Sequence, residues 1–170
     1  DGWLHTGDLG EIDAAGFLRI TDRKGEIFKT GTGKFVAPSR IEANIKRSVF
    51  VTQAMVVGSG RPHPIALICP NWPLMRLEFP GLRGTPPEVL VHREDVRAFL
   101  THEVHKQTHG LANYEQIRRI IVIPQEFSVE GGELSPSMKI KRRVVEERYA
   151  SQIEVAFRSE TPMSPSLLRA

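Results

Sequence analysis

Cysteine and long apolar runs are both scarce in this 170-residue sequence. Cys69 is the single cysteine, so an internal disulfide is excluded and a cytosolic location is the default expectation. No stretch approaches the ~20 apolar residues that span a bilayer, and the first residues do not resemble a signal peptide. The sequence therefore argues against a disulfide-stapled scaffold and against a helical membrane protein.

The lone cysteine lies within the apolar run of residues 65–69. Free cysteines in such runs behave as small hydrophobes, so Cys69 is predicted to be a buried structural thiol and not a nucleophile. Aromatic residues make up 7% of the chain. They are scattered and do not alternate with basic residues as they do on nucleic-acid platforms.

Positive charge is in modest excess, with a net charge of +3. Much of it falls in the run Lys139-Ile140-Lys141-Arg142-Arg143. From charge alone, this run favours a nucleotide, a nucleic acid or an anionic membrane surface as partner.

Hydrophobic periodicity divides the chain into short elements. The expected order is a hairpin of strands 4–12 and 17–21, a helix opening at 38–42, strands 53–57 and 65–69, a helix from about 93 to 108, a strand at 119–123 and a terminal helix from 140 to about 157. Loops are expected at 80–87 and 128–136, and the proline-containing tail 159–170 is predicted to be disordered. This order predicts an α+β fold. Because a structured hairpin opens the chain, we expect it to be a piece of something longer.

Three segments carry candidate chemistry: Thr6-Gly7-Asp8, Asp22-Arg23-Lys24-Gly25-Glu26 and the stretch 134–142. Each has an ordinary structural explanation when taken alone. Asp8 can form a turn, Arg23 can be a surface charge, and Lys139 can be one cation on a solvated helix.

Together and in this order, the segments resemble the adenylate-forming family of acyl-CoA synthetases, luciferases and peptide-synthetase adenylation domains. The resemblance runs from Gly2 to about Tyr149. The matching stretches are Trp3-Leu4-His5-Thr6-Gly7-Asp8-Leu9-Gly10, residues 16–24, residues 29–38 and Gly132-Glu133-Leu134-Ser135-Pro136-Ser137-Met138-Lys139. The last two look like the long-chain fatty acid branch in particular.

This resemblance implies roles for three charged residues. Asp8 would accept hydrogen bonds from the ribose hydroxyls of ATP, since a carboxylate takes two donors at once. Arg23 is similar to the family's arginine near the same ribose. Lys139 matches the catalytic lysine, whose ammonium would stabilise charge while a carboxylate attacks the α-phosphate of ATP. Lys141 shares the motif and ranks second.

The resemblance also implies a hinge and a loop for coenzyme A. The hinge position in relatives, commonly aspartate or lysine, corresponds to Gly25, with Lys24 as a neighbour that could compensate. A glycine still permits a swivel but offers no side chain to bias one orientation. Gly31 and Gly33 match the loop that approaches the pantetheine arm of coenzyme A, although an ordinary glycine turn explains them as well.

The resemblance implies an α+β lid domain with a short β-hairpin and a mixed three-stranded sheet flanked by helices. Residues 1–22 are assigned to the end of a large N-terminal adenylation domain and residues 23–158 to a mobile C-terminal domain. The implied parent enzyme is a long-chain fatty acid–CoA ligase that uses ATP, Mg²⁺ and coenzyme A and releases AMP and pyrophosphate. The Mg²⁺ ligands are expected in the N-terminal domain, and the 170-residue chain alone is expected to be inactive.

Two other functions remain open: an adenylating enzyme that passes its acyl group to a carrier protein, and a basic module that binds nucleic acid or anionic lipid through residues 139–143. The partners expected on the ligase interpretation are the N-terminal domain and small-molecule substrates, with no nucleic acid. A cytoplasmic location is expected, with peripheral membrane contact left open. His102, His105 and His109 share a helix face, but it is interpreted as a solvated surface, so no metal site is predicted.

Overall fold

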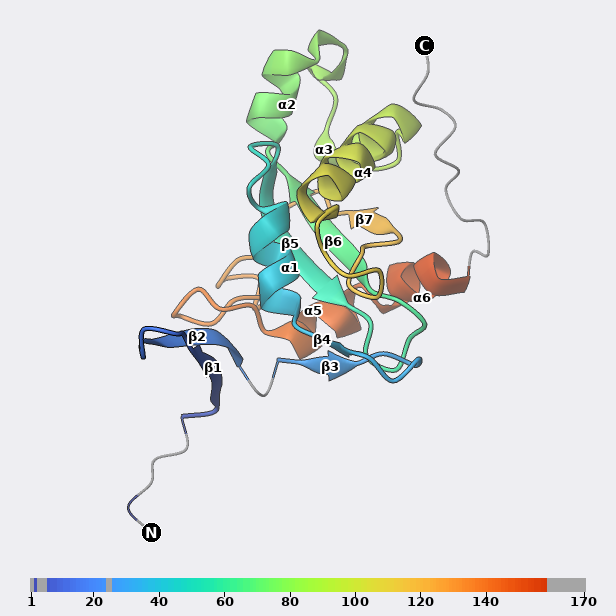
Figure 1. The fold of residues 1–170 in the computed structure, drawn as a ribbon. Coiled ribbons are helices and arrows are strands. Elements are labelled where there is room, and N and C mark those ends of the chain that lie inside the picture. Colours follow the sequence, from blue (N-terminus) through green and yellow to red (C-terminus); the bar gives the residue numbers. More distant parts are fainter. Residues whose placement is uncertain (1, 3–5, 24–25, 159–170) are drawn as a thin grey trace.

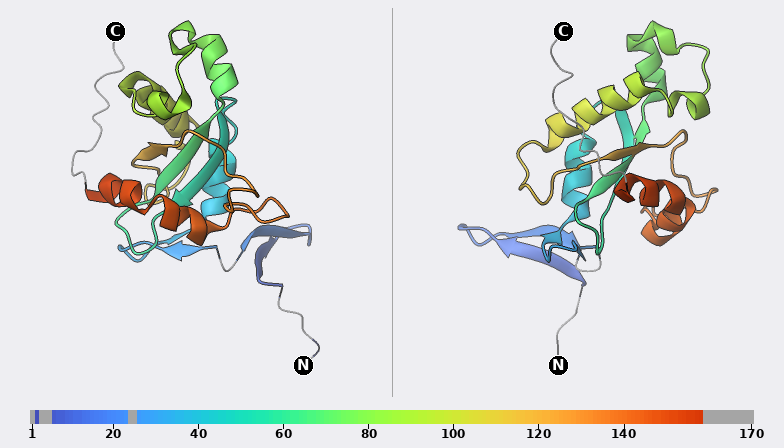
Figure 2. Two further views of the ribbon diagram at one scale, coloured as in Figure 1. Left: turned by 180° about the vertical axis from the view of Figure 1, so that it is seen from behind. Right: turned by 90° about the vertical axis from the view of Figure 1, so that its right-hand side faces the viewer.

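The computed structural model describes residue 2, residues 6–23 and residues 26–158; for residues 8, 9 and 21–23 it describes the backbone alone. The chain begins with an antiparallel hairpin of β1 (Asp8–Ile12) and β2 (Leu18–Arg23). Asp13 fixes its turn, because the carboxylate accepts hydrogen bonds from the N–H groups of Ala15 and Phe17, both at 2.9 Å. The hairpin projects away from the rest of the fold (Figures 1 and 2).

A three-stranded mixed sheet forms the centre of the domain. Its order is β5 (Val51–Val57), β6 (Ile65–Pro70) and β7 (Ile120–Val122), with β5 antiparallel and β7 parallel to β6. All six residues of β6 are buried. A central strand covered on both faces needs apolar side chains at every position, which explains its unbroken apolar run.

Helices cover the two faces of this sheet and create two cores (Figures 1 and 2). On one face, Ala54, Val56, Ala66 and Ile68 belong to a core with residues of α1 (Pro38–Ile45) and α4 (Glu94–Thr108). On the other face, Met55, Val57, Ile65, Leu67 and Cys69 belong to a core with residues of α5 (Arg142–Arg148) and α6 (Ala150–Arg158). The twofold alternation of side chains along the strands produces this division. The predicted α+β fold is confirmed.

Short elements complete the domain. β3 (Phe28–Lys29) and β4 (Phe35–Val36) form a second small hairpin before α1. After β6, the chain continues through α2 (Trp72–Glu78), a 3₁₀ turn η1 (Pro80–Leu82) and α3 (Pro87–Leu90). The side chain of Asn71 caps α2 by accepting a hydrogen bond from the N–H of Leu74 at 3.2 Å.

Two predictions about elements were wrong. The terminal helix is not continuous, because the chain breaks at Tyr149 between α5 and α6. The ring of Tyr149 packs against Phe127, so a tertiary contact coincides with the break. Residues 80–87, predicted as a loop, contain η1 and the first residue of α3. The tail 159–170, predicted to be disordered, lies outside the described residues. Within the described part of the chain, no helix is long and apolar enough to cross a bilayer.

Candidate active-site loops and the family of the chain

Lys139 lies at the end of a tight, braced turn. The N–H of Ser135 donates to the carbonyl of Lys139 at 2.8 Å, and the Ser135 hydroxyl accepts a hydrogen bond from the N–H of Lys139 at 3.1 Å. Met138 has φ 61°, an unusual value for a residue with a side chain. The Lys139 side chain is exposed. The turn therefore holds the Lys139 backbone at both its N–H and its carbonyl, while the side chain is exposed to solvent.

The two segments that flank this turn are tied to each other and to α5. Leu134 and Ile140 form an antiparallel bridge, and the N–H of Lys141 donates to the carbonyl of Glu133 at 2.7 Å. The buried carboxylate of Glu133 forms an ion pair with Arg148 of α5. The loop is thus a small, anchored structure, although it belongs to no extended sheet.

Arg142, the first residue of α5, makes a partly buried anchor on the other side of the lysine. Its guanidinium donates to both carboxylate oxygens of Glu42 at 2.9 Å each and to the carbonyl of Val56 at 3.2 Å. The same carboxylate accepts a hydrogen bond from the N–H of Val56 at 2.7 Å. The sequence alone does not predict this contact. Its one available signal was a glutamate at position 42, beside the buried face of α1 that carries Ile41 and Ile45.

Asp8 and Arg23 occupy paired positions in the first hairpin. Their Cα atoms are partners at the open end of the β1–β2 ladder, close to a register shift between Leu9 and Gly10. The backbone therefore brings together two of the residues predicted to contact a ribose. The hinge residues Lys24 and Gly25 follow immediately in the sequence and lie outside the described residues.

Gly31 and Gly33 lie together in the turn of the β3–β4 hairpin, and each meets a local structural demand. The N–H of Gly31 donates to the carbonyl of Arg61 at 2.7 Å, and a Cβ at Gly31 would lie 3.0 Å from the carbonyl oxygen of Gly60. Gly33 has φ +84°, which favours glycine. Both glycines remain exposed. The turn thus presents bare backbone at the surface while packing against the loop between β5 and β6.

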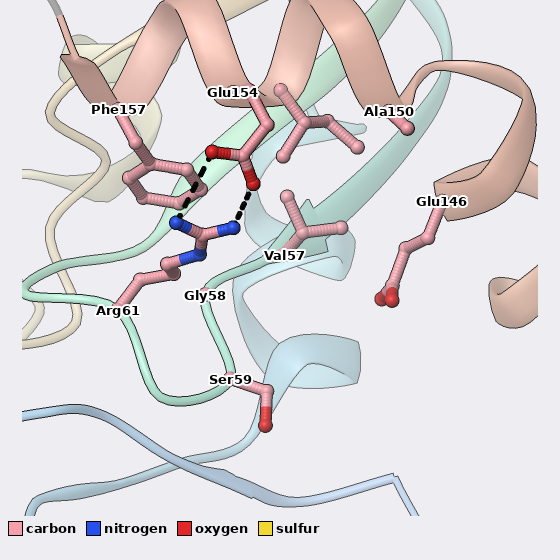
Figure 3. Close-up of a pocket in the computed structure, with 9 residues that line it drawn as sticks. Val57, Gly58, Ser59, Arg61, Glu146, Ala150, Glu154 and Phe157 are labelled. Carbon is pink, nitrogen blue, oxygen red and sulfur yellow. Dashed lines mark hydrogen bonds and ion pairs between the residues drawn. The ribbon is translucent and has the colours of Figure 1, made fainter.

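The cavity in Figure 3 lies between α5, α6 and the end of β5. Arg61 forms an ion pair with Glu154, and its guanidinium lies 5.0 Å from the centre of the Phe157 ring. Ser59 and Glu146 add polar groups to the lining. Lys139, Gly31 and Gly33 are not among its lining residues. Among the described residues that line this pocket, Arg61 is the only cation, and it is already paired with Glu154.

Other candidate groups have structural partners. Cys69 is buried, as predicted, and burial raises the pKa of its thiol to about 11. The rings of His105 and His109 each contact a backbone carbonyl, of Ile117 at 3.1 Å and of Lys106 at 2.9 Å. Among the residues that the structure describes, no group of three or more His, Cys, Asp or Glu side chains is arranged to hold a metal ion.

Comparisons with known proteins match the chain over most of its length. The family model of the AMP-binding enzyme C-terminal domain matches residues 26–161. A long-chain-fatty-acid–CoA ligase of Mycobacterium tuberculosis is 37% identical over 167 residues, which cover 94% of this chain and 27% of the relative. Long-chain-fatty-acid–CoA ligase 6 of Homo sapiens is 37% identical over 162 residues, covering 91% of this chain and 23% of the relative.

Solved structures also match most of the chain. The A domain of a carboxylic acid reductase from Segniliparus rugosus, in complex with AMP and a co-purified carboxylic acid, matches with a TM-score of 0.73 at 29% identity. The match covers 88% of this chain and 22% of that one. The chain spans about a quarter of the length of the curated relatives described above. With four fifths of its residues matched by one family model, the chain belongs to the AMP-binding enzyme C-terminal domain family.

Proposed function

We propose that this chain is the C-terminal domain of an AMP-forming long-chain fatty acid–CoA ligase. Such an enzyme first joins a fatty acid to ATP as acyl-AMP with release of pyrophosphate. It then transfers the acyl group to coenzyme A and releases AMP. The observation that carries the proposal is the anchored turn that holds Lys139 exposed in a domain of this family.

Lys139 is proposed to act in the first half-reaction. A carboxylate oxygen must approach the α-phosphate of ATP, so two anions repel one another and charge builds on the phosphoryl oxygens. An ammonium already held in place reduces this repulsion and stabilises the new charge without reorganising at the moment of reaction. The fixed backbone of Lys139 supports this role, because the loop need not fold when substrate binds.

Asp8 and Arg23 are proposed to hold the ribose of the nucleotide. Their backbone pairing supports this assignment, since a carboxylate and a guanidinium at adjacent positions suit a sugar hydroxyl beside a phosphate. Mg²⁺ would neutralise phosphate charge when bound. We expect its ligands in the N-terminal domain.

The second half-reaction is proposed to use the β3–β4 turn. Residues 1–22 would end the N-terminal domain, residues 23–158 would form the mobile domain, and rotation at Lys24 and Gly25 would exchange the Lys139 loop for Gly31 and Gly33. Two small residues at an exposed turn leave room for the thin pantetheine arm of coenzyme A. One site can then serve two reactions, because the lid presents different residues to it.

The test is Lys139→Ala in the full-length protein, compared with Lys141→Ala, the second-ranked lysine of the motif, which should lower acyl-adenylate formation far less. We expect Lys139→Ala to lower acyl-adenylate formation, followed as pyrophosphate release with palmitate, by about 10²–10³-fold. Thioester formation from supplied acyl-adenylate should fall by less than about 3-fold, because a different face of the lid serves that step. Equal loss of both half-reactions would refute the division of labour. The 170-residue chain alone should form no acyl-CoA.

A carrier protein is the alternative acyl acceptor. The A-PCP didomain of the Segniliparus carboxylic acid reductase matches this chain at 30% identity with a TM-score of 0.71. This match is the observation that favours a carrier protein as acceptor. Supplying the full-length protein with palmitate, ATP and either free coenzyme A or a carrier protein separates the two functions. Salt-sensitive binding of the isolated chain to DNA or anionic vesicles would instead support a basic binding module.

A further inference from the structure

Arg142 connects the segment that carries Lys139 to the interior of the domain. Its bidentate pair with Glu42 attaches the start of α5 to α1, and its third hydrogen bond reaches the backbone of β5 at Val56. Glu42 in turn accepts from the N–H of the same Val56. Guanidinium, carboxylate and peptide group therefore form a closed set of contacts with a single geometry.

Burial distinguishes this pair from the neighbouring one. The side chains of Arg142 and Glu42 are 22% and 9% exposed, whereas those of the Arg143–Glu147 pair are 91% and 65% exposed. Solvent screens the exposed pair, and long side chains at the surface move freely. The Arg142–Glu42 pair is largely shielded from solvent and held by two hydrogen bonds, so it fixes the direction in which the chain leaves the Lys139 loop.

The same guanidinium also approaches the segment that follows the proposed hinge. Its Nη2 lies 3.8 Å from a carboxylate oxygen of Glu26. Glu26 is held in place, because this carboxylate accepts a hydrogen bond from the Ser39 hydroxyl at 2.8 Å. Glu26 directly follows Gly25 in the sequence. One side chain thus contacts α1, β5 and the first residue beyond the hinge.

Only two residues separate Arg142 from Lys139, and their backbone is fixed as well. The Leu134–Ile140 bridge and the hydrogen bond from Lys141 to Glu133 leave little freedom between Lys139 and Arg142. A displacement of Arg142 must therefore be transmitted to Lys139. A reacting group misplaced by about 1 Å can cost ~10²-fold in rate.

We infer that Arg142 is a positioning residue for adenylation: with Glu42 it fixes the Lys139 loop to α1 and β5, and through Glu26 it ties that loop to the segment leaving the hinge. This inference rests on the proposed function of Lys139. It assigns to Arg142 no contact with substrate. Hinge rotation then delivers the ammonium to one place, because the loop and the segment beyond the hinge move as one body.

The experiment measures both half-reactions in the full-length protein carrying Arg142→Met, Arg142→Lys or Glu42→Gln. Adenylation is expected to fall about 10–100-fold, with thioester formation from supplied acyl-adenylate changed by less than about 3-fold. Arg142→Lys keeps the positive charge but loses the bidentate geometry. It therefore still tests the inference if the Arg142→Met variant does not fold. Arg143→Met and Arg143→Lys are the matched controls, and both should leave each half-reaction unchanged within about 2-fold.

A double-mutant cycle with Lys139→Ala separates positioning from general damage. If Arg142 acts through Lys139, adding Arg142→Lys to Lys139→Ala lowers adenylation by no more than about 2-fold further. The inference would be overturned if the fold-losses in adenylation from the two substitutions multiply in the double variant. Equal losses in both half-reactions would overturn it as well. Lys139→Ala alone tests the proposed function, which is refuted if this variant adenylates normally. If Lys139→Ala lowers adenylation but the Arg142 variants do not, only the positioning role of Arg142 is refuted.

Discussion

Gly31 and Gly33 share one short turn but should respond differently to alanine. At Gly31, the added Cβ would lie 3.0 Å from the carbonyl oxygen of Gly60 and 3.4 Å from backbone atoms of Arg61. At Gly33, the nearest atom outside the turn is the Cε of Lys29 at an ordinary 3.7 Å, but φ is +84°. The first substitution therefore meets a contact that is too close, and the second meets backbone strain.

The magnitudes follow from these two causes. The loop that faces Gly31 cannot easily withdraw, because hydrogen bonds from Gly31 to Arg61 at 2.7 Å and from Gly60 to Lys29 at 2.8 Å hold it. Overpacking of this kind costs about 1–3 kcal/mol, so we expect Gly31→Ala to destabilise the domain by about 2 kcal/mol. The left-handed conformation costs a side chain about 1–2 kcal/mol. Reduced freedom of the unfolded chain offsets part of that, leaving about 1 kcal/mol for Gly33→Ala.

Equilibrium unfolding in urea, followed by circular dichroism, measures both changes. Gly84→Ala is the matched control for Gly33→Ala, since Gly84 has φ +72° with nothing within 4 Å of a Cβ and is also exposed. Gly33→Ala and Gly84→Ala should lower the free energy of unfolding by the same amount within about 0.5 kcal/mol. Gly33→Asn should lower it less than Gly33→Ala, because asparagine tolerates this conformation. A neutral or stabilising Gly31→Ala would refute the close approach between the turn and the β5–β6 loop.

Two further predictions concern buried groups. Because burial raises the pKa of Cys69 to about 11, its thiol should not react with a disulfide reagent at pH 8 until the chain unfolds, and reaction at the rate of a free thiol would refute its burial. Burial also lowers the pKa of His63 from 6.5, and the charges of Arg118 and Arg119 add to the effect. The unfolded imidazole then takes up a proton more readily, so the free energy of unfolding should decrease as pH falls from 6.5 towards the lower folded pKa. His63→Asn should remove that part of the pH dependence, as measured by urea unfolding across this range.

The central strands could be predicted because their burial leaves a direct mark on the sequence. Residues 65–69 are apolar at every position, and the structure covers both faces of β6. The two cores themselves could not be read from the sequence. Which residues of β5 and β6 face α1 and which face α6 depends on the register of the strands, and no local pattern fixes that register when both faces are buried.

The errors arose where tertiary contacts decide the outcome. Neither glycine nor proline marks the break at Tyr149, and helical hydrogen bonds from Tyr149 to Val145 and from Ile153 to Tyr149 continue on either side of it. The periodicity alone therefore predicted one helix. The helix α2 was missed although its start carries a cap, Asn71 followed by Trp72 and Pro73. Here the capping signal is present in the sequence, but the helix is only 7 residues long.

The resemblance of motifs predicts Lys139 as the catalytic lysine, but the sequence does not show how its backbone is held. A lysine in a basic run attracts anions wherever the run is placed, and such attraction in water is weak. What a phosphoryl-transfer site needs is an ammonium already in position, and position comes from groups distant in sequence: Glu42 and Val56 hold Arg142, and Arg148 holds Glu133. The two neighbouring arginines differ in this respect. Arg142 pairs with the buried Glu42, whereas Arg143 pairs with Glu147 at the surface. The function proposed for this loop therefore depends less on the total positive charge of the run than on the fact that Arg142 is largely shielded from solvent and anchors the chain next to the exposed Lys139.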